Sequence, residues 1–416
     1  VASSAMAEDL AARAARAWSH FRSLGSPRFH VAPMVDQSEL AFRQLCRRHG
    51  AEAAYTPMLH ARLFVDKEAY RTEHFTTCEG DRPLFAQFCA NDPDTLLAAA
   101  RHVEGRCDYV DLNLGCPQRI AKKGNYGAFL MDDLPRVESL VRMLASNLST
   151  PVSVKIRKFD DLERTLAYAR MLQDAGASLL AIHGRTREQK NAKEWRADWD
   201  VIRAVKKELS IPVLGNGDVR SREDALRLMA YTGCDGVMSA DPLLKNPRLF
   251  REVATEEERE AEAAPHLPCD SALEYLDACG EHPPPWRMVK GHLHSIMGSW
   301  FKEFTDLRER LNTARPGEYD AVRAMIGEAR ERVVKIVADE GRREPVPVKS
   351  ARTIAREEAE AAKQAAIEEQ RREDDHVASI TPPASAAAAG GEGDEPPAKR
   401  PREGESTVTR PATIAA

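Results

Sequence analysis

Eight short apolar runs alternate with amphipathic stretches between about residues 26 and 255, and this alternation limits the fold more than any other feature of the chain. The runs have strand character and are Phe29–Ala32, Ala53–Tyr55, Pro83–Cys89, Tyr109–Leu114, Val152–Arg157, Ser178–His183, Pro212–Leu214 and Gly236–Ser239. The stretches between them have helical spacing, and two begin at a capping serine, Ser38 and Ser221. Eight strand–helix units in roughly 230 residues predict an α/β fold, the (β/α)8 TIM barrel. A doubly wound open sheet is the alternative, but the turn after the first run, Pro33–Asp36, lacks the glycine fingerprint typical of that fold.

The rest of the chain has a different pattern. From about Pro268 to Asp339 only helical spacing is present, and Trp286–Leu307 and Tyr319–Val337 each repeat apolar residues at that spacing, which predicts a small all-helical domain. Beyond Arg342, charged residues and alanine dominate up to Asp375, and Pro, Ala, Gly, Ser and Glu follow, which predicts a charged helix and a disordered C-terminal tail. The predicted parts are an N-terminal extension (1–25), a catalytic barrel (26–260), a helical domain (261–341) and the helix with its tail (342–416).

Composition narrows the class of protein. The chain has 416 residues, a net charge of −5 and eight cysteines without a Cys-x-x-Cys pair, so neither a zinc site nor a disulfide framework is expected. No apolar run approaches the ~18 residues of a membrane helix, and Val1–Trp18 lacks the apolar core of a signal peptide. We expect no metal ion, no membrane and no stable protein partner. The expected location is the cytoplasm, with the nucleus as a second location from Lys399–Arg402, although a solvated charge run is the more common explanation of such a cluster.

A set of mostly polar residues stands at the ends of the predicted strands, where a barrel carries its active site. They are Pro33, Met34, Gln87, Asn113, Cys116, Lys155, Arg157, His183, Asn216, Gly217, Asp218, Ser239 and Ala240. Lys155 lies inside an apolar strand and is costly to bury without a partner, which an anionic or polarised ring would supply. Gly215 and Gly217 let backbone N–H groups approach phosphate oxygens closely. The pattern indicates a site for a phosphorylated flavin.

Cys116 follows the fourth run within Gly-Cys-Pro, ahead of a glycine-containing loop. A lone cysteine is more often a small buried apolar residue than an acid. Its position between Gly115 and Pro117 at a strand end favours the functional interpretation. Beside a flavin, this thiol predicts a redox enzyme with a thiol acid.

Cations gather in the loops that follow these strands, although the net charge of the chain is negative. They are Arg119, Lys122, Lys123, Lys158, Arg185, Arg187, Lys190, Lys193, Arg220 and Arg222. A basic rim around a concave site suits a phosphate-rich partner.

Six segments in this order resemble the signature segments of the tRNA-dihydrouridine synthases. They are Ala32–Met34, Asp111–Pro117, Gly124–Ala128, Val154–Arg157, Ile182–Arg187 and Gly215–Asp218. The resemblance runs from about Phe29 to Phe250, and the helical segment after it has the position of the family's RNA-binding domain. Tyr126–Leu130 and Met238–Ala240 resemble the eukaryotic branch that acts on adjacent D-loop uridines, the 16/17 type.

The resemblance implies an FMN enzyme that reduces uridine to 5,6-dihydrouridine in the D-loop of tRNA, with NADPH or NADH as the reductant of the flavin. Hydride would pass from reduced FMN to C6, and Cys116 would donate a proton to C5. FMN would be held by Pro33, Met34, Val35, Gln87, Lys155, His183, Asn216, Gly217, Asp218, Ser239 and Ala240. Substrate would be contacted by Asn113, Arg157, Arg119, Lys123 and Arg185.

One departure and two alternatives stay open. Many family members carry Gly-Arg at the eighth strand for the FMN phosphate, whereas this chain has Ser239-Ala240-Asp241, so the phosphate contacts would depend more on His183, Gly217 and backbone amides. The first alternative function is an FMN barrel oxidoreductase of the dihydroorotate type that acts on a small molecule. The second is a non-catalytic RNA-binding protein.

Overall fold

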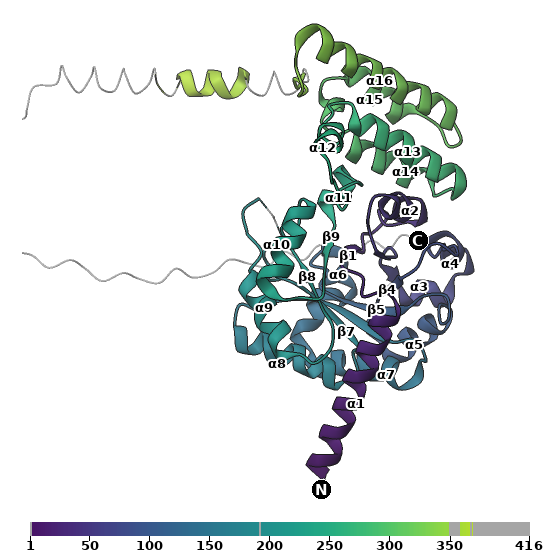
Figure 1. Ribbon diagram of the computed structural model, residues 1–416, viewed down its shortest axis with the longest axis vertical. Coiled ribbons are helices and arrows are strands. Elements are labelled where there is room, and N and C mark those ends of the chain that lie inside the picture. The colour runs from purple at the N-terminus through teal and green to yellow at the C-terminus, as the bar shows by residue number, and fades with distance from the viewer. Residues whose placement is uncertain (1, 191–192, 349–357, 367, 369–416) are drawn as a thin grey trace, which may run out of the picture. The chain divides into compact units, whose positions relative to one another are not determined.

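The computed structural model describes residues 2–190, 193–348, 358–366 and 368 (Figure 1). The chain forms two compact units, Val1–Val348 and Lys349–Ala416. In the second unit the described residues are helical and exposed, which agrees with the predicted charged helix. The predicted disordered tail and the basic cluster Lys399–Arg402 lie outside the described residues. No helix in the described part of the chain is long and apolar enough to cross a membrane.

The first unit contains a closed parallel barrel. Its strands are β1 (Phe29–Val31), β2 (Ala53–Tyr55), β4 (Leu84–Cys89), β5 (Tyr109–Leu114), β6 (Val152–Arg157), β7 (Leu179–His183), β8 (Val213–Asn216) and β9 (Gly236–Ser239). Strand β1 pairs with both β2 and β9, and β2 also pairs with β4, so the ring closes. This confirms the (β/α)8 TIM barrel and excludes the open sheet. A short strand that was not predicted, β3 (Leu59–His60), pairs with the end of β4.

Helices cover the outside of the barrel (Figure 1). They are α2 (Leu40–Arg48), α3 (Ala61–Asp66), α4 (Glu68–His74), α5 (Pro93–Arg101), α6 (Arg119–Gly124), α7 (Leu134–Asn147), α8 (Leu162–Asp174), α9 (Trp199–Glu208), α10 (Arg222–Thr232) and α11 (Asp241–Lys245), with a 3-10 helix η1 (Gly127–Asp132). Several begin at a side-chain cap, such as Asp92 for α5 and Ser221 for α10. Each cap satisfies a backbone N–H of the first turn that has no partner inside the helix.

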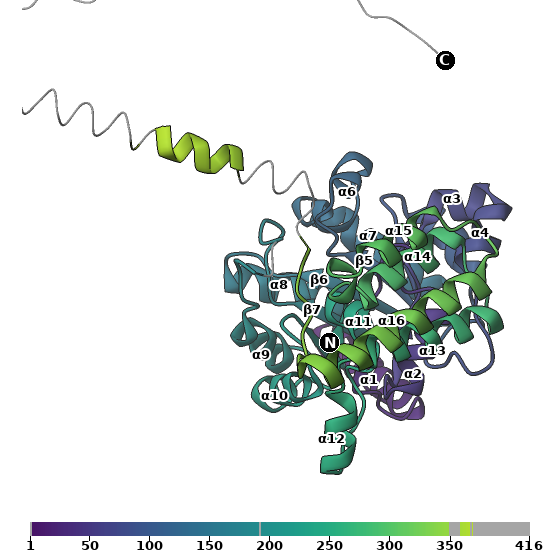
Figure 2. The same cartoon turned by 90° about the horizontal axis from the view of Figure 1, so that it is seen from above.

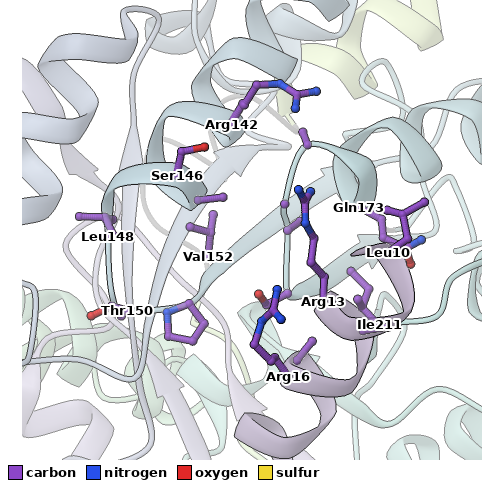
Figure 3. Close-up of a pocket in the computed structure, with 18 of the residues that line it drawn as sticks. Leu10, Arg13, Arg16, Arg142, Ser146, Leu148, Thr150, Val152, Gln173 and Ile211 are labelled. Carbon is purple, nitrogen blue, oxygen red and sulfur yellow. The ribbon is translucent and has the colours of Figure 1, made fainter. Parts of the chain in front are cut away.

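The N-terminal extension forms helix α1 (Ala2–Ser23), which covers the end of the barrel where the strands begin. Phe21 is buried in a cluster with Tyr55, Phe85 and Tyr109 from the barrel interior, and Trp18 donates from Nε1 to the Ser210 carbonyl at 2.7 Å. A cavity of about 410 Å³ lies at this end, between α1 and the starts of β6 and β7 (Figure 3). It is far from the strand ends that carry the predicted site.

Helices alone follow the barrel: α12 (Glu256–Glu262), α13 (Leu267–Glu281), α14 (Trp286–Ile296), η2 (Trp300–Lys302), α15 (Thr305–Thr313) and α16 (Tyr319–Glu340). The helical spacing predicted over Trp286–Leu307 is divided between elements, because α14 ends at Ile296 and a 3-10 turn follows Gly298. Glycine disfavours helix, and Trp300 is fixed in the turn by its Nε1 donating to the Pro265 carbonyl at 2.8 Å. The apolar spacing survives the break since Phe301 and Phe304 are still buried.

The helical region is attached to the barrel through α2. Seen from above, α13 and α16 lie over the side of the barrel that carries α2 (Figure 2). A buried carboxylate joins them: Glu39 accepts from Tyr275 Oη at 2.7 Å and lies 2.8 Å from His292 Nε2. The boundaries predicted inside this unit, at residues 25, 260 and 341, stay predictions.

Candidate functional site

The strand register sets the predicted polar residues beside one another at the carboxyl end of the barrel. Asn113 of β5 is paired with Lys155 of β6. One step further along, Arg157 of β6 is paired with His183 of β7, and His183 with Asn216 of β8. Four neighbouring strands therefore place these five side chains around one end of the barrel, as the sequence predicted.

A buried carboxylate below them organises the loop that carries the thiol. Asp111 accepts a hydrogen bond from Ser153 Oγ at 2.6 Å and another from Gln87 Nε2 at 2.8 Å. Gln87 Oε1 accepts from Asn113 Nδ2 at 2.8 Å, and Asn113 Oδ1 accepts from the backbone N–H of Cys116 at 2.9 Å. Burial raises the pKa of Asp111 to about 6. A chain of hydrogen bonds thus runs from the barrel interior to the backbone of Cys116.

Asp111 and Ser153 were not among the predicted site residues. Both carry a signal in the sequence, because each stands two residues before a predicted site residue on the same strand, Asn113 and Lys155. Side chains two apart on a strand point to the same face. A polar residue at an interior position of a barrel strand needs a buried hydrogen-bond partner. Here Ser153 and Asp111 are hydrogen-bonded to each other.

Cys116 is half-buried and stands in a loop with little freedom. Its carbonyl accepts from the Ala128 N–H at 3.1 Å, and a Cβ at Gly127 would lie 2.8 Å from that carbonyl oxygen. Gly127 also has a φ of +64°, so residues other than glycine are disfavoured there on both counts. On the other side, Arg157 Nε donates to the Gly115 carbonyl at 2.8 Å. The loop therefore holds the thiol at a fixed place beside the barrel mouth.

Lys155 points its ammonium group into the mouth of the barrel. Nζ lies 3.1 Å from Asn216 Oδ1, and in the described part of the chain this is its one hydrogen bond, so two of its three donors are left for a ligand. Asn216 is itself fixed by donating from Nδ2 to the Met238 carbonyl at 3.0 Å. Burial and the positive charge of Arg157 lower the pKa of Lys155 to about 8. A cation held at this cost fits a partner that carries negative charge.

His183, Arg185 and Asp218 form a second polar group on β7 and β8. Arg185 is buried, pairs with Asp218 Oδ1 at 2.6 Å, and donates from Nη1 to His183 Nε2 at 3.0 Å. Burial and the neighbouring cations lower the pKa of His183 well below its usual range, so the ring is neutral. Because Nε2 accepts from Arg185, the ring proton is on Nδ1 and is available as a donor. Contact of Arg185 with substrate stays a prediction, and the structure gives this residue a positioning role.

Gly217 stands in a tightly packed turn after β8 that excludes a larger residue. Its φ is +121°, and a Cβ there would lie 2.5 Å from Ala197 Cβ and 3.1 Å from the His183 ring. Its carbonyl accepts from Trp199 Nε1 at 3.2 Å, which fixes the turn. Asp218 accepts from the Ala197 N–H at 2.7 Å. The turn is therefore fixed directly beside the His183 ring.

The residues predicted at the ends of the first and last strands are held mainly by contacts within the protein. Met34 is buried, its backbone N–H donates to Ser38 Oγ at 3.1 Å, and Pro33 before it is partly buried. Val35 is 57% exposed and is free to cover a ligand. Ser239 donates from its hydroxyl to the Val219 carbonyl at 2.8 Å, so this hydroxyl faces the protein, and Ala240 opens the turn into α11.

The predicted basic rim divides into paired and unpaired cations. In the described part of the chain, Arg119, Lys122 and Lys123 on α6 are exposed and make no ion pair. Lys158 and Arg187, by contrast, are held by carboxylates. The exposed cations of α6 lie a few residues after Cys116 in the chain, and phosphate binding by the rim stays a prediction.

The sequence of this chain was compared with those of known protein families. The family described as "Dihydrouridine synthase (Dus)" matches residues 30–340, which include both the barrel and the helices after it. The chain belongs to the dihydrouridine synthase family. The resemblance seen in the signature segments is confirmed, and the similar proteins described below carry the positions 16/17 in their names.

Three similar proteins show how far the sequence similarity of this chain extends. The rat "tRNA-dihydrouridine(16/17) synthase [NAD(P)(+)]-like" is 46% identical over 296 residues, 71% of this chain and 65% of its own. The Saccharomyces cerevisiae "tRNA-dihydrouridine(16/17) synthase [NAD(P)(+)]" is 45% identical over 298 residues, 70% of each chain. The Schizosaccharomyces pombe enzyme of the same name is 40% identical over 337 residues, 76% of this chain and 80% of its own. The match thus spans somewhat less than two thirds of the rat protein.

Proposed function

We propose that this chain reduces uridine to 5,6-dihydrouridine in the D-loop of tRNA, at the adjacent positions 16 and 17, with NADPH or NADH as the source of electrons. The observation that carries the proposal is the place of Cys116: a thiol fixed by Asn113 and Gly127 beside a barrel mouth that also presents the ammonium group of Lys155. The names of the similar rat and yeast proteins support the substrate and the nicotinamide reductant.

The residues present fit FMN as the bound cofactor. Lys155 has two unused donors, His183 carries a proton on Nδ1, and Gly217 brings the backbone of the next turn against the His183 ring. We assign the flavin ring to Lys155 and Asn216, and its phosphate to His183, Gly217 and nearby backbone amides. When bound and reduced, the flavin supplies the hydride that is added to C6 of the uracil.

The side chains of this protein then have separate tasks. Cys116 donates the proton on Sγ to C5 of the uracil, since a thiol is protonated at neutral pH and can act as an acid. Asn113 holds the backbone of Cys116, and Arg157 holds the preceding carbonyl, so the thiol does not have to be ordered in each turnover. Arg119 and Lys123 on α6 bind the phosphates on either side of the base. The helical region over 261–341 is assigned to the remaining contacts with tRNA.

The test is mass spectrometry of unmodified tRNA after incubation with the protein, FMN, and NADPH or NADH. We expect a gain of two hydrogens at D-loop uridines 16 and 17. Cys116→Ala is expected to lower the rate of this gain by roughly 10²–10⁴-fold while flavin and tRNA binding are kept. The matched control is Cys78→Ala, another partly exposed free cysteine, which should keep the wild-type rate.

Each result has a clear meaning. A flavin spectrum without any gain of mass in tRNA would contradict the proposal and favour an oxidoreductase that acts on a small molecule. A colourless protein that binds tRNA would favour the non-catalytic alternative. A normal rate for Cys116→Ala would remove the thiol from its assigned role and leave the substrate standing.

A further inference from the structure

A second cavity lies at the carboxyl end of the barrel, one side chain away from Cys116. Its volume is about 150 Å³. Residues from three segments line it, the β3–α3 turn, the end of β4 with the start of α5, and the end of α6: His60, Ala61, Arg62, Cys89, Ala90, Asn91, Asp92, Thr95, Gly124 and Tyr126. These residues are outside the set assigned to the flavin, so the cavity needs its own explanation.

The inner wall of the cavity is shared with the thiol. Cys89 and Tyr126 form a buried cluster against which Cys116 packs. Burial raises the pKa of the Cys89 thiol to about 12, with a smaller contribution from Cys116. Gly124 approaches the Tyr126 ring so closely that a Cβ there would lie 2.4 Å from the ring. A ligand in the cavity would therefore lie close to a ligand at the Cys116 thiol.

Two polar side chains that line the cavity have hydrogen-bonding capacity that the protein does not use. His60 Nδ1 is buried and has no hydrogen-bond partner among the described residues. Burial and the charge of Arg62 lower the pKa of His60, so the ring is neutral and offers both a donor and an acceptor. Asn91 donates from Nδ2 to the Gly124 carbonyl at 3.0 Å, which leaves its Oδ1 as an acceptor. One donor and one acceptor at a small cavity match the edge of a uracil, which carries carbonyl oxygens and an N–H.

The walls and the rim fit a nucleotide as well. The rings of His60 and Tyr126 stand perpendicular with centroids 5.7 Å apart, and both border the cavity. Arg62 is exposed and makes no ion pair in the described part of the chain, so it is available to a phosphate. A cavity of about 150 Å³ holds a benzene-sized ring, which is the size of a pyrimidine base.

We propose that this cavity binds the uracil base next to the one that is being reduced. The inference rests on the proposed function and deepens it: an enzyme that reduces two adjacent uridines must lift both from the stack, and while one base lies at Cys116 the other needs a place. The cavity supplies that place and selects a pyrimidine neighbour. His60 and Asn91 read its edge, and Arg62 binds its phosphate.

The first test uses three tRNA transcripts that differ only next to the assayed uridine, where they carry uridine, adenosine or an abasic site, and reduction is scored at the assayed position alone. Contact between a base and aromatic walls is worth about 1–3 kcal/mol, so kcat/KM for the wild-type protein should fall roughly 5- to 150-fold when the neighbour is adenosine or absent. In His60→Leu the three transcripts should differ less than ~2-fold, because the ring that forms the wall and reads the edge is lost. His102→Leu, an exposed histidine at the far end of α5, is the matched control and should keep the wild-type preference.

A second measurement locates the base directly and does not depend on any variant. A transcript with 4-thiouridine at the neighbouring position is irradiated in complex with the wild-type protein, and the crosslinked peptide is sequenced. A crosslink to His60–Arg62 or Tyr126 supports the proposal, and a crosslink only to other segments overturns it. Equal kcat/KM on all three transcripts also overturns it, while the proposed function stands. No gain of two hydrogens on any transcript overturns both.

Discussion

The buried ammonium group of Lys155 should lower the free energy of unfolding of the flavin-free protein, although the functional site needs its charge. Burial and the charge of Arg157 lower its pKa from 10.5 to about 8. Since a tenfold change in an equilibrium corresponds to ~1.36 kcal/mol, the difference of about 2.5 in pKa corresponds to about 3 kcal/mol of unfavourable free energy at pH 7. The side chain lies at the open end of the barrel and keeps part of its surface exposed, so water screens some of this cost. We therefore expect that removing the charge would raise the free energy of unfolding by about 2 kcal/mol.

The change to make is Lys155→Met, which keeps the length of the side chain and removes the charge. Without flavin, the variant should be more stable than the wild type at pH 7 by about 2 kcal/mol, yet it should lose its flavin on purification. The gain has a defined pH dependence. Above the folded pKa of about 8 the wild-type lysine releases its proton in the folded state first, so wild-type stability rises until the unfolded pKa near 10.5. The advantage of the variant should therefore shrink between pH 8 and pH 10.5.

Urea unfolding of both flavin-free proteins at pH 7 and pH 10, followed by circular dichroism, measures this difference. Lys158→Met is the matched control, because Lys158 lies one residue past the same strand and pairs with Asp198 at 3.1 Å. It should give no gain in stability at either pH. The reasoning is refuted if Lys155→Met is less stable than the wild type at pH 7, or if its advantage is the same at both pH values.

Two further predictions concern tRNA and the helical region. Arg119→Ala should weaken tRNA binding and reduce the slope of log K against log salt by about 1, with flavin content unchanged; binding titrations at several salt concentrations measure this, and an unchanged slope would remove Arg119 from the phosphate contacts. Glu39→Leu should lower the free energy of unfolding by about 3–5 kcal/mol, because Tyr275 Oη and His292 Nε2 lose their buried partner. Urea unfolding against the exposed control Glu73→Leu tests it, and equal midpoints would contradict it.

The structure separates the tasks of the two ends of the barrel. At the end where the strands begin, α1 and apolar rings such as Phe21 and Tyr109 fill the interior, which contributes to stability. At the other end, Lys155 and His183 hold polar atoms that the protein itself does not fully satisfy. Polar groups that are costly for the fold are thus concentrated where a ligand can compensate for them.

Periodicity is a local property, and for that reason the sequence alone determined most of the framework. Strands β2, β5, β6 and β9 begin and end at the residues predicted from alternating apolar character. The position of Cys116, Lys155 and His183 at strand ends also follows directly from counting along the chain. Short elements without a full period, such as β3 and α6, were not predicted, because two to six residues carry too little pattern to be recognised.

Tertiary structure alone decided which side chains meet. Arg185 looked like a free cation in a loop, but closure of the barrel brings Asp218 to within 2.6 Å of it from 33 residues further along the chain. The cavity beside Cys116 likewise exists because the turn with His60 and the loop with Tyr126 come together across β4. Such contacts depend on strand register and ring closure, which are properties of the whole fold. The sequence therefore determined the barrel and the ends of its strands, and the packing of distant segments determined which charges are neutralised and which polar atoms remain for a ligand.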